Sequence, residues 1–146
     1  MFPTQPRNNF AKTKVNAPLN FSGKMATWKV LKAALPRQMG IMAVYHSKSM
    51  NWNSESFVDR IPKRWPKKRA KYGGKTLVKT GRLKSSIRIL KLTQNKVEVG
   101  TTVGYGIKHQ EGREGFPVRQ FTGHSSVLSK ATGRMIVSKL NRAMQV

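Results

Sequence analysis

The chain has 146 residues and no cysteine, and its 29 lysines and arginines against five aspartates and glutamates give a formal net charge of +24 at pH 7. The length suits one domain with a buried core, and the lack of cysteine excludes disulfides, thiol nucleophiles and thiolate metal sites. So large a charge opposes compaction and indicates a polyanionic neighbour, either nucleic acid or an acidic protein surface.

Residues 1–21 contain three prolines, four asparagines and no acidic residue, which predicts an extended arm that becomes ordered only against a neighbour. This segment lacks the apolar stretch of a secretory signal, and the sequence lacks the run of about 20 apolar residues that a membrane-spanning helix needs. The pentapeptide TVGYG at 102–106 therefore matches a potassium-channel filter in letters only. We expect a soluble, intracellular chain with one α+β domain over residues 22–146.

A first helix is predicted to follow the arm. Ser22 or Thr27 can cap it, and Pro36 is expected to kink or split it. Its apolar residues recur at three- and four-residue steps, so they are expected to form one core-facing side. These residues are Trp28, Leu31, Leu35, Met39 and Met42.

A basic loop is predicted next, because residues 60–97 hold 14 basic residues and no carboxylate. Prolines and glycines argue against a regular helix in RIPKRWPKKRAKYGGK (60–75), and Trp65 and Tyr72 could stack on bases or pack against lysine stems. The loop is either solvated surface or a contact site for DNA or an acidic partner. The contact residues in the second interpretation are Arg60, Lys63, Arg64, Lys67, Lys68, Arg69, Lys71 and Lys75.

An antiparallel hairpin is predicted after the loop, with its turn at residues 93–96. The first strand should slip once in register, since Ile87 and Ile89 are followed by Leu90 and Leu92. The second strand, in KVEVGTTV, places alternate residues from Val97 to Val103 on one face. FPVRQFT (116–122) is expected to be a short edge strand because it contains Pro117, and residues 103–125 otherwise to have little regular structure.

A last helix is predicted to begin at Ser125 or Ser126, with an apolar inner side and a basic outer side. No acidic residue lies near its start, so its dipole is expected to be unmatched there. The complete order is an N-terminal helix, a basic loop, a small antiparallel sheet (a hairpin plus an edge segment) and a C-terminal helix, which defines an α+β fold.

The sequence contains few groups of residues that could form a catalytic site. Glu55 and Asp59, and also Glu111 and Glu114, are close enough in sequence to form carboxylate pairs, but helix capping or pairing with arginine is the favoured interpretation. The three histidines share no metal-binding spacing, and His109 beside Glu111 has no nucleophile next to it. Gly74-Lys75-Thr76 lacks the earlier glycine of a phosphate-binding loop. We expect that the chain is not an enzyme and that it binds no cofactor or metal.

Several blocks of sequence together resemble a known family. Trp65-Pro66, LVKTGRLKSSI (77–87), VEVGTTVGYGIKHQEG (97–112) and FPVRQFTGHS (116–125) are similar, in this order, to the signature of the phage virion morphogenesis family of tail-completion proteins. The chain departs from this family at Gly106, where alanine is common, and in the lack of acids near the last helix. The matching positions also include Thr80, Gly81, Leu83, Ser86, Ile87, Val99, Gly100, Thr101, Tyr105, His109, Gly112, Pro117, Arg119, Phe121 and Gly123.

The resemblance implies a structural virion protein at the head–tail connector, neck or tail terminus, which forms a ring and completes assembly of the tail. A hexamer is one such ring. The implied partners are further copies, other neck, portal-adaptor or tail proteins, and double-stranded DNA in the lumen, without a membrane. The expected location is the virion, and the host cytoplasm during assembly. A basic nucleic-acid-binding protein, ribosome- or packaging-associated and without a ring, is the alternative.

The long segment after the hairpin is the expected subunit interface of such a ring. Phe116 and Phe121 would be its apolar anchors and Arg119 its charged one, although both phenylalanines suit the chain's own core equally well. The full set of expected interface residues is Tyr105, His109, Phe116, Pro117, Arg119 and Phe121.

Overall fold

The computed structural model describes residues 21–68 and 73–145. The predicted arm lies outside the described residues except for Phe21, where the first helix begins. The described chain has an α+β fold of two long helices, several short helical segments and two separate two-stranded antiparallel sheets.

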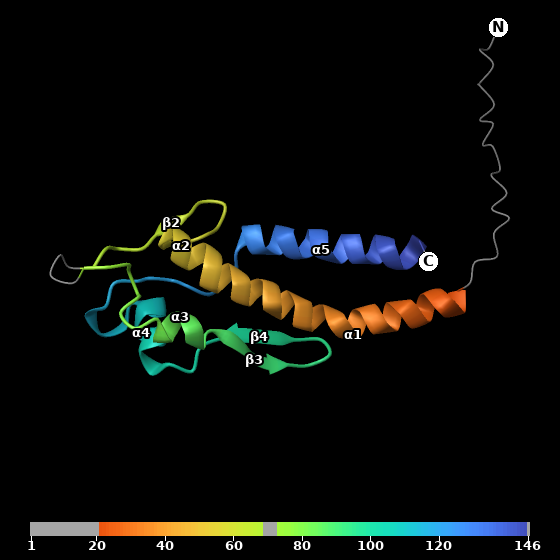
Figure 1. Cartoon of the computed structure of the whole chain (residues 1–146), viewed down its shortest axis with the longest axis horizontal. Helices are drawn as coiled ribbons and strands as arrows, with labels where there is room; N and C mark the ends of the chain where they lie inside the picture. The colour runs from red at the N-terminus through yellow and green to blue at the C-terminus, as the bar shows by residue number, and fades with distance from the viewer. Residues whose placement is uncertain (1–20, 69–72, 146) are drawn as a thin grey trace, which may run out of the picture.

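Helix α1 (Phe21–Tyr45) is the central element. It continues into a π-helical segment, η1 (His46–Asn51), and a short helix, α2 (Trp52–Ser54). Helix α5 (Ser126–Gln145) packs along one side of α1, and the hairpin of β3 (Arg88–Leu92) and β4 (Val97–Gly100) packs along the opposite side (Figure 1). The first turns of α1 extend past the end of this hairpin.

Pro36 does not split α1, which runs through it without interruption and is curved in Figure 1. Neither predicted cap begins the helix, since Thr27 lies inside it and donates its hydroxyl hydrogen bond back to the carbonyl of Gly23 (3.0 Å). The expectation of a single buried side is also wrong, because Trp28 is 39% and Met39 36% exposed. Apolar side chains occur around the whole helix, so its two packing layers leave some of them uncovered.

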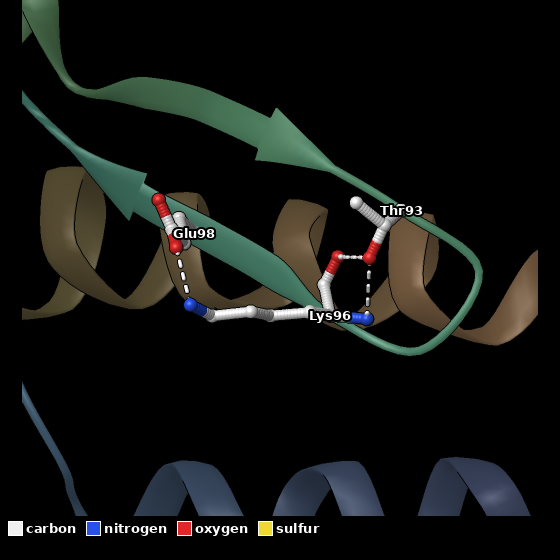
Figure 2. Close-up of polar contacts among 3 residues, drawn as sticks. All are labelled: Thr93, Lys96 and Glu98. Atoms are coloured by element: carbon white, nitrogen blue, oxygen red, sulfur yellow. Dashed lines mark hydrogen bonds and ion pairs between the residues drawn. The ribbon is translucent and has the colours of Figure 1, made fainter.

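The β3–β4 hairpin confirms the predicted register slip. Ile89 pairs with Val99 and Lys91 with Glu98, and the irregularity lies between them. The turn closes where it was expected: the Thr93 amide donates to the Lys96 carbonyl (2.8 Å), and the Lys96 ammonium pairs with Glu98 (2.5 Å; Figure 2).

Five short elements of the described chain, two strands and three helical segments, complete the fold around the end of α1. Strand β1 (Ser56–Phe57) pairs with β2 (Lys63–Arg64). Strand β2 lies within the predicted basic loop, and β1 lies just before it. Helix α3 (Arg82–Ser86) precedes the hairpin, and the Thr80 hydroxyl accepts the amide of Arg82 at 3.4 Å, which is a weak cap. Helix α4 (Gly104–Glu111) and the 3-10 turn η2 (Arg113–Gly115) replace the irregular segment that we expected there.

The predicted edge strand at residues 116–122 does not form. Its backbone amides find other acceptors: Arg119 donates to the His109 carbonyl (2.7 Å), and Phe121 donates to the side-chain oxygen of Gln110 (3.0 Å). The α4 residues thus take the place of a neighbouring strand.

The apolar core lies at the end of α1 that carries α2. Trp52 packs against Trp65 and Phe121, with ring centroids 5.2 and 5.4 Å apart, and Leu83 and Ile87 complete the cluster. Beside it, the fully buried Asn51 donates to the Phe121 carbonyl and accepts the Val58 amide (2.9 Å each). No helix within residues 21–68 and 73–145 is long and apolar enough to cross a bilayer.

The start of α5 confirms the predicted cap and corrects the expectation of an unmatched dipole. Ser125 accepts the Leu128 amide on its hydroxyl (3.3 Å), while Asp59 accepts the amide and hydroxyl of Ser126 (2.8 and 2.6 Å). These bonds, led by that from the Ser126 hydroxyl, lower the pKa of Asp59 to about 2. The negative charge at this helix start comes from a distant part of the sequence.

Candidate functional site

A groove of about 980 Å³ lies between the segment before α3 and the segment of α4 and η2. We call it the basic groove. Its charged lining residues are Lys68, Lys79, Arg82 and Arg119, and its large apolar ones are Leu77, Val78, Leu83, Tyr105 and Phe116. The groove therefore brings part of the predicted basic loop together with part of the predicted subunit interface.

The first wall is anchored by Glu55. Its carbonyl accepts the Trp65 amide (2.8 Å) and its carboxylate accepts the Thr76 amide (2.6 Å), so one residue closes the base of the loop between them. Beyond Thr76, the chain turns at Leu77, which has a left-handed backbone (φ 60°) that is costly for a residue with a branched side chain.

The second wall depends on the end of α4. Gly112 ends the helix in the left-handed conformation (φ 70°), and a Cβ atom there would lie 2.6 Å from the Val118 side chain. Glycine thus lets the chain fold back over α4. Gln110 fixes the returning segment, because its amide oxygen accepts the amides of Phe121 and Thr122 and its amide nitrogen donates to the Thr122 carbonyl.

Arg119 is 7% exposed and lies between the two walls. Its guanidinium donates to the carbonyls of Pro66 (2.8 Å) and Lys67 (3.2 Å), so it ties the basic loop to the second wall. Burial lowers the pKa of Arg119, because the charged guanidinium has lost hydration there. The two carbonyls satisfy its donors without neutralising its charge.

His109 lies next to Arg119, with Nδ1 3.5 Å from a guanidinium nitrogen, and its ring meets Phe116 edge-on at 5.0 Å. Burial, assisted by the nearby charge of Arg119, lowers the pKa of His109. This shift favours the neutral imidazole, which adds aromatic surface to the groove.

No acidic side chain neutralises the groove. Glu55 and Asp59 accept backbone amides, and the other three carboxylates form ion pairs outside the groove: Glu98 with Lys96, Glu111 with Arg113 and Glu114 with Lys108. These five are all the aspartates and glutamates of the sequence. The four groove cations therefore form no ion pair with an acidic side chain.

The predicted contact residues of the basic loop are only partly brought together. Lys68 lines the groove, and its ammonium donates to the Gly73 carbonyl at 3.4 Å. Arg69 and Lys71 lie outside the described residues. The remaining predicted cations are exposed and do not line the groove: Arg60, Lys63, Arg64, Lys67 and Lys75.

Of the predicted interface residues, Tyr105, His109, Phe116 and Arg119 line the groove, while Pro117 is exposed outside it. The prediction of Phe121 as an interface residue is wrong. Phe121 is 2% exposed and packs on Trp52, so it belongs to the chain's own core. Sequence reasoning missed Lys79 and Arg82 as site residues, although both lie in the stretch without carboxylates that signalled the basic loop.

The candidate acid–base pair of the sequence is not brought together in the groove, which His109 lines and Glu111 does not. His109 and Glu111 are engaged separately, with Arg119 and Arg113 as their respective neighbours. Within the described part of the chain, no three His, Asp or Glu side chains are grouped to hold a metal ion. Comparisons of the chain with family models, with curated proteins and with solved structures found no match.

Proposed function

We propose that this chain is an assembly protein, whose work is done by binding copies of itself and other proteins. Large apolar side chains are exposed along the outside of a fold that already has a core, and such surface is typical of protein contacts. On α1 these are Met25, Trp28, Val30, Met39, Ile41 and Tyr45, each at least 36% exposed.

More particularly, we propose a structural protein of a tailed phage particle, in a ring at the head–tail junction that completes the tail. The supporting observation is that the blocks that resemble the phage family form one connected unit. Trp65, Leu83, Ile87 and Phe121 lie in one core cluster, and the hydroxyls of Ser86 and Thr101, from two separate blocks, are 2.5 Å apart.

Electron microscopy of the purified full chain tests this proposal. We expect rings at low micromolar concentration, and fewer rings when Ile41 and Tyr45, exposed on α1, are both changed to serine. Val137→Ser, on the exposed side of α5, is the matched control for loss of apolar surface. A chain that stays monomeric at every concentration, yet binds any DNA with a steep salt dependence, would favour the alternative of a basic nucleic-acid-binding protein.

The exposed cations of the basic loop are assigned to DNA or to an acidic partner in this proposal. Charge reversal at Arg64, Lys67 and Lys68 should weaken that binding without lowering the melting temperature of the domain. Unchanged particle assembly by this variant would instead make the loop solvated surface.

A further inference from the structure

The basic groove contains a buried positive charge that the chain itself does not neutralise. Arg119 is bound by two carbonyls and an imidazole, and none of these partners carries a negative charge. Lys79 and Arg82 add two exposed cations on the opposite wall. The donors of Arg119 are therefore satisfied while its charge has no counter-ion, and a carboxylate or phosphate held in the groove by Lys79 and Arg82 would supply the missing negative charge.

The remaining lining of the groove is apolar. Tyr105 is 41% and Phe116 42% exposed, and Leu77 and the buried Leu83 also line the groove. Double-stranded DNA keeps its bases stacked and presents mainly phosphates and sugars, whereas an acidic peptide can place a carboxylate and an aliphatic or aromatic side chain side by side. The left-handed backbone of Leu77 is consistent with a binding role, since strained residues cluster at ligand sites.

A second copy of this chain is a poor source for the carboxylate, because it would bring 29 lysines and arginines with only five acidic side chains, of which Glu55 and Asp59 already accept backbone amides. We therefore infer that the basic groove binds an acidic segment of a different protein. A carboxylate of that segment pairs with the exposed Lys79 and Arg82, in the same groove as the buried charge of Arg119, and a neighbouring apolar side chain packs on Phe116 and Tyr105. The inference rests on the proposed function and names the chemistry of one partner.

Fluorescence anisotropy with the purified full chain tests the inference. The probe is a short labelled peptide that alternates aspartate or glutamate with leucine, compared with its asparagine and glutamine counterpart and with an acidic peptide that has serine in place of leucine. We expect the first peptide to bind roughly tenfold or more tightly than either comparison peptide.

Variants locate the binding. Lys79→Glu with Arg82→Glu should weaken binding of the acidic leucine peptide roughly tenfold or more. Lys130→Glu with Arg134→Glu, on the exposed side of α5, makes the same change in net charge and should weaken it by about twofold or less. Phe116→Ala should abolish the advantage of leucine over serine. Circular dichroism and melting curves establish that each variant is folded.

Equal losses in the two charge-reversed variants would overturn the inference, because they would show attraction to net charge alone. It would also be overturned if a short DNA duplex competed fully for the groove while leucine brought no advantage, since the groove would then be a phosphate site. Rings that form with no preference for the acidic leucine peptide would refute this inference and leave the proposed function standing. If the groove binds the peptide but the chain never forms rings, the proposed ring is refuted and the inference about the groove stands.

Discussion

Gly106 marks the place where α4 touches the core. A Cβ atom at this position would lie 2.9 Å from the Thr101 side chain and 3.0 Å from that of Leu83. Gly104, two residues earlier in the same helix, has no heavy atom within 4 Å of its corresponding position. Gly106 therefore has a packing reason to be small, whereas Gly104 has none.

This contrast gives a matched pair of substitutions. Gly106→Ala should lower the free energy of unfolding by about 1–3 kcal/mol, because the added methyl overpacks a buried contact. Gly104→Ala should be neutral or stabilise by up to about 1 kcal/mol through helix propensity. Urea unfolding of both variants checks this, and equal effects would mean that α4 does not pack on the core as described.

At the scale of elements, the start of α5 depends on Asp59. The native pKa of about 2 lies below the ordinary value of 3.8, so the carboxylate stabilises the folded state fully above pH 4. Its contribution should be lost as the pH falls from about 4 to 2. We expect Asp59→Asn to be less stable than the original chain at pH 6, and the difference in urea midpoint to shrink toward pH 2.

Charge repulsion grows at acid pH in both proteins, so only the difference between them reports on Asp59. A difference that stays constant from pH 6 to pH 2 would mean that the carboxylate charge is not what holds the helix start.

The basic loop is a second element, and Glu55 closes its base. Glu55→Ala removes the acceptor of the Thr76 amide, and we expect trypsin to cleave faster after Lys68 and Lys75. Glu55→Gln keeps an oxygen at that place and should restore most of the protection. Mass spectrometry measures the cleavage rates of the original chain, Glu55→Ala and Glu55→Gln. Equal rates in all three proteins would show that the Thr76 contact does not hold the loop.

The sequence was sufficient for elements whose signals are local. The β3–β4 hairpin, with its slip after Ile89, and the start of α5 at Ser125 follow from alternation and capping residues. Helix α4 was missed because two glycines begin it, although Gly112 and the basic residues before it are a C-terminal signal. The groove itself was not predicted. Its two walls, which carry Lys79 and Phe116, are held together by contacts between residues far apart in the sequence, and no local sequence pattern contains such contacts. These contacts are made by Glu55, Gln110 and Arg119.

For the whole molecule, charge balance decides the response to salt. All five acidic side chains are engaged, and the formal net charge is +24, so repulsion dominates at long range. The melting temperature should rise by several degrees between about 0.1 and 1 M NaCl, as the Debye length falls from about 10 to 3 Å.

The control for this prediction is a variant with less charge and the same core: Lys29→Gln, Lys32→Gln, Lys130→Gln and Arg134→Gln, all at exposed positions. Its melting temperature should rise less with salt. A fall in the melting temperature of the original chain would mean that local ion pairs outweigh the net repulsion.

The layered position of α1 also sets an order of events during synthesis. The hairpin that covers one side of α1 follows it within about 50 residues, whereas α5, which covers the other side, begins about 80 residues after α1 ends. At about 5–20 residues per second, a ribosome needs roughly 4–16 s to bridge that interval. Throughout this time one side of the nascent helix has no internal cover, so the chain should be a client of ribosome-bound chaperones.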